Sequence, residues 1–199
     1  MRKPSKSSFC LISSILLLSL SGCAAFRAGK LPPVSSWPPQ SAVAKKSIGI
    51  VVSGQVFING AQQEVAPMLI KNWEQEVLRA YRDSGLFSEV NSGPTPSDLR
   101  AEVRIVDRGE GSMAMAALTG FTFYLIPSTA TDEFIITTTI RDRNGQIIGK
   151  IEHSEAVTLW QQFFLIFIMP AYSPFSVPQE VLYDLNRTTI NTAKAKKYL

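Results

Sequence analysis

The Asn-Gly dipeptide at positions 144 and 145 constrains the fold of this 199-residue chain more than any other local feature. It separates two runs rich in β-branched residues, 134–141 and 146–157. Asn-Gly suits the type I′ turn, whose twist matches that of two paired strands. The sequence therefore predicts an antiparallel β-hairpin, with a buried face that carries Phe134, Ile136 and Ile140.

Two helices are predicted on either side of this hairpin. The first begins near Pro67, ends near Gly85, and repeats an apolar residue every four positions: Val65, Leu69, Trp73, Val77 and Tyr81. The second follows the capping-box spacing of Ser176 and Gln179 and has lysines near its end.

Three further strands are predicted at residues 48–52, 87–90 and 99–106, the last with strict alternation of apolar and charged residues. Together these elements predict an α+β fold, with a mostly antiparallel sheet of about four to five strands packed with two helices. The expected order is β-α-β-β-(apolar segment)-β-β-(apolar segment)-α.

Two apolar segments, 113–126 and 159–169, flank the predicted hairpin, and neither reaches the roughly 20 residues that span a bilayer. Because paired hairpin strands place Ile126 and Leu159 at one end of the sheet, we expect the two segments to lie side by side. They are interpreted either as buried core or as an exposed surface for a partner protein, a lipid or the bilayer. The candidate interaction residues are Phe121, Phe123, Tyr124, Trp160, Phe163, Phe164 and Phe167.

The N-terminus has the pattern of a secretory signal peptide. Arg2, Lys3 and Lys6 precede an apolar run from Phe9 to Leu20, which is too short to cross a membrane as a helix. The run ends in Leu20-Ser21-Gly22-Cys23, which resembles the lipobox of bacterial lipoproteins.

The resemblance implies cleavage before Cys23, a diacylglyceryl group on its thiol, and a further acyl chain such as palmitate on its α-amine. Several acyl chains hold a protein stably on a membrane. Since Ala24, Ala25 and Phe26 follow Cys23 in place of Asp, the resemblance implies the outer membrane, facing the periplasm. Cleavage at another position and an uncleaved anchor are the alternatives.

This interpretation divides the chain into three parts: a signal peptide at 1–22, a lipid-anchored Pro/Ser-rich tether at 23–46, and a single α+β domain at 47–199. Removing residues 1–22 takes away three of the 20 basic residues and none of the 16 acidic ones, which leaves a net charge of +1. A near-neutral chain argues against nucleic-acid binding. With Cys10 removed and Cys23 acylated, no disulfide can form.

Catalytic residue patterns are largely missing from the sequence. His153 is the only histidine and is predicted to be an ordinary sheet residue, so neither a His-based metal site nor a Cys-His pair is expected. The neighbours Asp132 and Glu133 should point to opposite faces of a strand, and Asp107 and Glu110 are expected to be solvated around a turn. No cofactor or metal is predicted.

The order of elements also resembles a group of uncharacterised Gram-negative envelope lipoproteins. The resemblance rests on the Ser84-Gly85-Leu86-Phe87 helix exit, on Ile126-Pro127-Ser128 before Thr131-Asp132-Glu133, and on Trp160 followed by an apolar run ending near Ser173-Pro174. That group has no assigned activity. The lipid anchor, together with the missing catalytic patterns, predicts a lipid-anchored, non-catalytic binding or assembly module whose partner is an envelope protein or a lipid. The alternatives are a carrier of a hydrophobic ligand and a hydrolase that uses a serine with His153.

Overall fold

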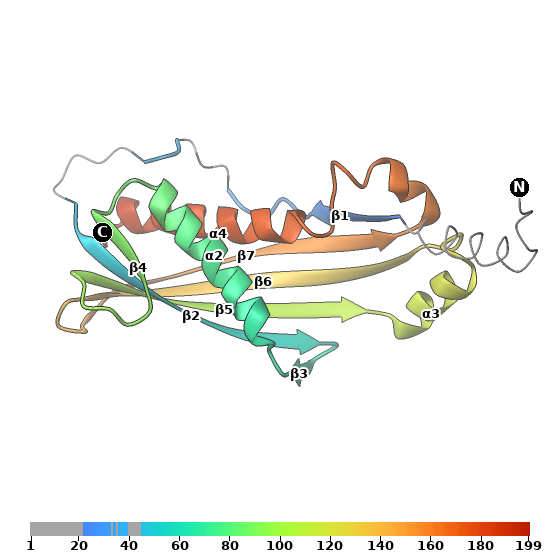
Figure 1. The fold of residues 1–199 in the computed structure, drawn as a ribbon, viewed down its shortest axis with the longest axis horizontal. Coiled ribbons are helices and arrows are strands. Elements are labelled where there is room, and N and C mark those ends of the chain that lie inside the picture. Colours follow the sequence, from blue (N-terminus) through green and yellow to red (C-terminus); the bar gives the residue numbers. More distant parts are fainter. Residues whose placement is uncertain (1–21, 33, 35, 40–44) are drawn as a thin grey trace, which may run out of the picture.

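Two long paired strands, β6 (Ser128–Asp142) and β7 (Ile147–Gln161), set the length of the molecule. The computed structural model describes residues 22–32, 34, 36–39 and 45–199. In it the strands belong to a seven-stranded sheet in the order β1-β7-β6-β5-β2-β3, with β4 paired to β2. Two long helices, α2 and α4, lie on one face of this sheet (Figure 1).

The remaining elements follow the predicted order with additions. The α+β class and the mostly antiparallel sheet are confirmed, but the sheet has seven strands in place of the four to five expected. Strands β1 and β3 and the helix α3 were not predicted. The other bounds are β1 (Cys23–Arg27), β2 (Ser47–Ile58), β3 (Ala61–Gln63), α2 (Pro67–Asp83), β4 (Glu89–Ser92), β5 (Leu99–Gly111), α3 (Met113–Phe121), a 3-10 helix η1 (Phe163–Phe167) and α4 (Val177–Ala195).

The hairpin is present, but its turn differs from the predicted type I′ turn. Gly145 has a positive φ of 82°, whereas Asn144 is not among the described residues with positive φ. The Asp142 carboxylate accepts the backbone N–H groups of Asn144 and Gln146, both at 2.9 Å. This side chain closes a longer loop over 143–146, in which only the glycine needs the left-handed region.

The core lies between the sheet and the two helices, as the alternation of the strands predicts. Ile50, Ile105 and Ile136 are fully buried and share one hydrophobic cluster with side chains of the helices: Trp73, Val77, Val181 and Leu185. Gly54 of β2 allows the closest approach, because a Cβ atom there would lie 2.3 Å from the Trp73 ring. The absence of a side chain at Gly54 therefore sets how closely α2 packs on the sheet.

The second predicted helix corresponds to α4, but the predicted capping box does not form. Ser176 is the N-cap residue, yet it has helical dihedral angles (φ −90°, ψ −37°) and its side chain makes no capping hydrogen bond. A capping hydroxyl normally needs an extended backbone at this position. Pro at the first turn, the buried apolar face and the packing on β7 therefore specify this helix.

The predicted tether at 23–46 needs correction at its start, because Cys23–Arg27 forms the edge strand β1, antiparallel to β7. Ala24 and Ala25 are buried there. The physical reason is that β7 extends to Gln161 and leaves an unpaired edge, whose backbone groups β1 satisfies. The five residues of β1 are too few to show a strand pattern in a Pro- and Ala-rich segment, so the sequence does not reveal that they pair with β7.

Polar contacts hold β1 and the residues after it against the fold. Arg27 pairs with Asp184 of α4 at 2.6 Å. The fully buried carboxylate of Glu155 in β7 accepts the backbone N–H groups of Lys30 and Leu31 at 3.2 and 3.1 Å. The beginning of the predicted tether is thus part of the folded unit.

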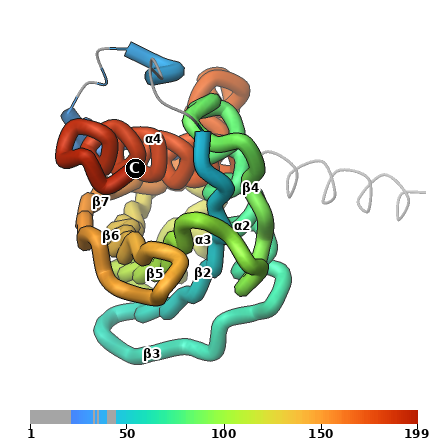
Figure 2. The backbone as a smooth tube through the Cα atoms, turned by 90° about the vertical axis from the view of Figure 1, so that its left-hand side faces the viewer, coloured from blue at the N-terminus to red at the C-terminus, as the bar shows by residue number. Residues whose placement is uncertain are grey.

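The long strands separate two ends of the molecule (Figure 1). Figure 2 looks along the sheet, with the turn between β6 and β7 toward the viewer. Residues 112–127, 160–175 and Cys23 form one end, which we call the apolar end. The hairpin turn at 142–146, the loop at 93–98 and the start of β2 at Ser47 form the other, which we call the distal end. At about 3.3 Å per residue, the fifteen residues of each long strand place the two ends roughly 45–50 Å apart.

Candidate functional site

The apolar end contains no charged residue. The sequence has no Asp, Glu, Lys or Arg from 112 to 131, nor from 156 to 179. These two ranges supply α3, the loop after it, the ends of the long strands and η1. Since charged residues make up 18% of the whole chain, their absence from both ranges marks this end.

Large apolar side chains at this end are exposed to solvent. Seven of them have exposed fractions between 61% and 83%: Met113, Phe121, Phe123, Leu125, Phe164, Phe167 and Phe175. Six more are exposed by 39–44%: Met115, Leu118, Ile126, Trp160, Ile168 and Tyr172. The interpretation of these segments as buried core is therefore wrong, because α2 and α4 already cover the core face of the sheet. Exposed apolar patches of this kind mark interaction surfaces.

The two apolar segments lie side by side, as predicted. The backbone N–H of Phe163 donates to the Tyr124 carbonyl at 2.9 Å, which joins the loop after α3 to the start of η1. Tyr124 and Phe163 are only half-buried, and their backbones connect the segments. Of the seven candidate interaction residues, the other five have exposed side chains.

The loop after α3 has an unusual backbone. Phe123 and Tyr124 are consecutive non-glycine residues with positive φ, 52° and 62°. This conformation is costly for bulky residues, at about 1–3 kcal/mol each. It is held by a hydrogen bond from the Tyr124 N–H to the Thr119 carbonyl at 2.8 Å, and the Phe123 ring is 71% exposed. The fold thus maintains a strained loop that presents an aromatic ring to solvent.

Cys23 lies at this same end. It is the first residue of β1, opposite Gln161 of β7, and its thiol is partly buried, which raises the thiol pKa. The carbonyl of Gly22 accepts the N–H of Gln162 at 3.0 Å. A Cβ atom on Gly22 would lie 2.2 Å from the backbone nitrogen of Ile166, so the chain that enters Cys23 passes directly over η1. The lipobox residues Leu20 and Ser21 lie outside the described residues.

Tyr172 connects β1 to the segment after η1. Its carbonyl accepts the Ala25 N–H at 2.9 Å, and its ring lies 5.0 Å from the ring of Phe26. The candidate lipidation site is therefore packed among the exposed apolar segments, with no flexible residues between Cys23 and the sheet.

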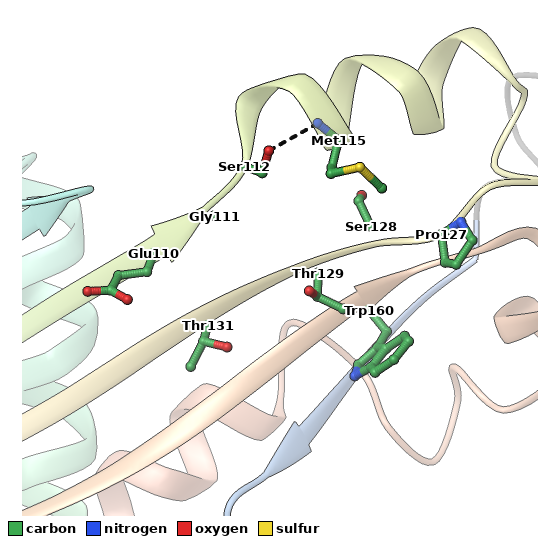
Figure 3. Close-up of a pocket in the computed structure, with 9 residues that line it drawn as sticks. All are labelled: Glu110, Gly111, Ser112, Met115, Pro127, Ser128, Thr129, Thr131 and Trp160. Carbon is green, nitrogen blue, oxygen red and sulfur yellow. Dashed lines mark hydrogen bonds between the residues drawn. The ribbon is translucent and has the colours of Figure 1, made fainter.

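A surface hollow of about 400 Å³ lies between α3 and the ends of β6 and β7 (Figure 3). Met115 and Trp160 contribute apolar surface to it, whereas Glu110, Thr129 and Thr131 contribute polar groups. Ser112, another lining residue, caps α3 by accepting the Met115 N–H at 3.2 Å. Most of the lining side chains are exposed, so the hollow is open to solvent.

His153 lies in β7, as predicted for a sheet residue, and its ring is within 3.3 Å of the Thr192 hydroxyl of α4. Burial, together with the charge of Lys196, lowers the pKa of this histidine. Over 22–32, 34, 36–39 and 45–199, no group of three or more His, Cys, Asp or Glu side chains is arranged to hold a metal ion.

Of the two carboxylates that were expected to be solvated, Glu110 is exposed but Asp107 is half-buried. Asp107 was expected around a solvated turn, but β5 continues to Gly111 and places Asp107 inside the strand. Burial, and then the nearby charge of Asp132, raises the Asp107 pKa from 3.8 to about 7. Gly109 leaves room for this arrangement, because a Cβ atom there would lie 2.8 Å from Oδ1 of Asp132.

This raised pKa predicts a pH-dependent stability. Between pH 4 and pH 7 the folded protein keeps a proton on Asp107 that the unfolded chain has lost, so stability falls as pH rises through this window. Asp107→Asn should therefore flatten the decrease and raise the urea midpoint at pH 8. The lowered pKa of His153 acts in the opposite direction below pH 6.5, so the comparison is made between variant and wild type. Exposed Glu110→Gln is the control, and parallel pH profiles for Asp107→Asn and wild type would contradict the assignment.

The candidate interaction residues chosen from the sequence left out Met113 and Leu125, although both lie within the apolar segment 113–126. Phe175 lies beyond both apolar segments and was missed altogether. All three are exposed, and the two long ranges without charge include them. Within the part of the chain that the structure describes, no helix has both the length and the apolarity needed to cross a bilayer.

No protein-family model matches the chain, and the comparison with curated proteins found no match. Among solved structures, a minor lipoprotein from Acinetobacter baumannii shares 12% identity at a TM-score of 0.44, over 78% of this chain and 95% of that one. The PelC dodecamer from Paraburkholderia phytofirmans shares 10% identity at 0.35, over 84% and 95% of the two chains.

A third similar structure is a putative neuraminyllactose-binding hemagglutinin homolog from Helicobacter pylori. It shares 7% identity at a TM-score of 0.39, over 80% of this chain and 92% of that one. All three TM-scores lie below 0.5, so these similarities say nothing about what this chain binds or does.

Proposed function

We propose that this protein is a lipid-anchored, non-catalytic binding or assembly module of a bacterial envelope, held directly against the membrane by its apolar end. Acyl chains on Cys23 provide the anchor. The outer membrane, with the domain in the periplasm, is the location that the residues after Cys23 favour. The distal end then points away from the membrane.

One observation carries the proposal: the candidate lipidation residue and the exposed, uncharged side chains share one end of the molecule. Cys23 is paired in the sheet, so an acylated Cys23 would hold this end within a few ångströms of the bilayer. The chain before Cys23 passes over η1, and an acyl group on the Cys23 nitrogen would leave along the same path.

The energetics favour the bilayer as the surface that covers this end. Fully burying a side chain such as Phe contributes about 1.5–3 kcal/mol, and several exposed phenylalanines are available. No charge from 112–131 or 156–179 would have to be desolvated. Trp160 and Tyr172 suit the headgroup region, where amphipathic rings are enriched.

The alternative of a hydrophobic-ligand carrier is less well supported. Ligand sites of carriers are enclosed and mainly apolar, whereas the hollow below α3 has a mixed lining of mostly exposed residues. The hydrolase alternative also lacks a triad arrangement, since the described hydrogen bond of His153 is to Thr192.

Photocrosslinking in cells tests the orientation. A photoreactive amino acid at Phe121, Phe164 or Phe167 should give adducts with lipid, because these side chains project from the apolar end. The matched control is Ile147, which is 59% exposed but lies next to the hairpin turn at the distal end. It should give no lipid adduct.

Other adducts would contradict the proposal. A discrete protein adduct from the three positions at the apolar end would assign this surface to a protein partner. Crosslinks only within the chain would mean that the side chains are covered by the protein itself. Equal lipid labelling from Ile147 would show that the chain has no preferred orientation on the membrane.

A further inference from the structure

The distal end carries a second cavity, of about 530 Å³, whose chemistry is opposite to that of the apolar end. The loop at 93–98 forms one wall and the hairpin turn forms the other. Its lining includes three arginines, Arg100, Arg141 and Arg143, together with Ser47 and Ser97. The hairpin turn that lines this cavity lies at the opposite end of the sheet from α3 (Figure 1).

Arg100 and Arg141 are direct partners across the antiparallel pair of β5 and β6. The neighbours of Arg100 in β5, Leu99 and Ala101, are buried, so Arg100 faces away from the helices. Residues opposed in this way have Cβ atoms about 4.5–5.5 Å apart, and two like charges in such a pair are unfavourable. An arrangement of this kind calls for a negative charge between the two guanidinium groups.

The carboxylates around the cavity are already engaged. Glu102 accepts Nε of Arg141 at 2.9 Å, and Asp142 accepts the two backbone N–H groups of the hairpin turn. Asp98 accepts the N–H and the hydroxyl of Ser47 at 2.9 and 2.8 Å and also pairs with Arg143.

Arg100 is left without such a partner. Across the described residues, no hydrogen bond or ion pair engages its guanidinium group, although the residue is half-buried in the cavity. Arg141 uses Nε for Glu102 and Nη1 for the Gly145 carbonyl at 3.0 Å, so its remaining Nη group is also available. Guanidinium groups bind carboxylates and phosphates through paired N–H donors.

We infer that this distal cavity binds an oxyanion, a carboxylate or a phosphate, between Arg100 and Arg141. The Ser97 hydroxyl donates to the Leu99 carbonyl at 2.7 Å, so the two arginines supply the donors for the bound group. The negative charge of the anion compensates the two positive charges of the facing arginines. An anionic group on a larger molecule would thereby be held at the end of the domain that faces away from the membrane.

Titration of the purified full chain tests this inference, with inorganic phosphate and acetate as separate probes and sodium chloride at matched ionic strength as the reference. The readouts are NMR shifts of the arginine Nε–H groups and the thermal midpoint. Saturable binding of phosphate or acetate, beyond the effect of chloride, is expected. The probe that saturates distinguishes a phosphate ligand from a carboxylate ligand.

Arg100→Gln should weaken this binding about tenfold or more, because charge-assisted hydrogen bonds are lost. Arg100→Lys keeps the charge but loses the paired donors, so it should have an intermediate effect. Arg104→Gln is the matched control, because it removes one cation from the same face of β5 without touching the cavity. It should change the affinity for the anion less than about twofold, since only a distant, screened charge is lost.

Two outcomes would overturn the inference. One is the absence of any shift beyond that of chloride for both probes. The other is an equal loss in Arg100→Gln and Arg104→Gln, which would reduce the effect to net charge. A single cooperative urea transition for each variant verifies that the comparison is made on folded protein. The titration needs no membrane, so its result is independent of the proposed anchor.

Discussion

Replacing Cys23 with alanine is expected to move the protein from the membrane fraction to the soluble fraction. The substitution removes the only sulfur to which a diacylglyceryl group can be attached in the chain from residue 23 onwards. Two or more acyl chains make membrane attachment stable, and their loss leaves only the apolar side chains of one end. Cys23 is partly exposed at the first position of an edge strand, so alanine should leave the fold intact.

Fractionation together with incorporation of labelled palmitate measures this effect. Cys10→Ala is the matched control, because it removes the other cysteine without touching the proposed attachment point. Wild type and Cys10→Ala should incorporate the label and sediment with membranes. Palmitate incorporation into Cys23→Ala would exclude Cys23 as the attachment point, and full retention in membranes without label would reveal a second anchor.

Trp73→Ala is expected to cost about 3–5 kcal/mol of the free energy of unfolding. The indole is 3% exposed and lies in the main hydrophobic cluster between α2 and β2. Its ring stands over Gly54, where a Cβ atom would lie 2.3 Å from Cζ3 of Trp73 and 2.7 Å from Cδ1 of Ile70. Removing the ring leaves a cavity at the centre of the packing between helix and sheet.

The same contact predicts a strong coupling between the two positions. Gly54→Ala alone should destabilise the protein by about 1–3 kcal/mol, because the ring has to shift to admit the methyl group. In the Trp73→Ala background the added methyl group should cost much less, since the ring is gone and only the terminal methyl group of Ile70 has to move into the space it leaves. Urea unfolding of the four proteins measures the difference.

Gly120→Ala in α3 is the control for the glycine substitution itself. Nothing lies within 4 Å of the position that its Cβ would occupy, so this change should stabilise the protein slightly, by up to about 1 kcal/mol, because alanine has the higher helix propensity. If the effects of Trp73→Ala and Gly54→Ala were additive, the close approach of α2 at Gly54 would not be a determinant of stability.

The helix α2 and the strands β5 to β7 could be predicted because each has a local side-chain period, whereas α4 was predicted from the residues at its two ends. The alternation of apolar and charged residues in β5 predicted one buried face with Ala101, Val103 and Ile105, and all three residues are buried. The spacing of Trp73, Val77 and Tyr81 likewise required one buried stripe, which packs on the sheet. Burial of one face is a property that local sequence can encode.

Only part of the candidate site could be predicted from the sequence. The apolar segments and Cys23 were identified from composition and motif, but whether the segments were buried could not be decided. Short apolar runs look alike in a core and on an interaction surface. The cavity with Arg100 and Arg141 was not identified at all, because facing residues on two strands depend on the pairing register.

The sequence by itself determined the fold class, the hairpin, the two long helices and the resemblance to a lipid-anchored chain, since each rests on a local pattern. Only the tertiary structure decided that residues 23–27 close the edge of β7, and that α3 and η1 remain outside the core. The physical reason is competition for partners: α2 and α4 already cover one face of the sheet, and the free backbone edge of β7 needs a strand.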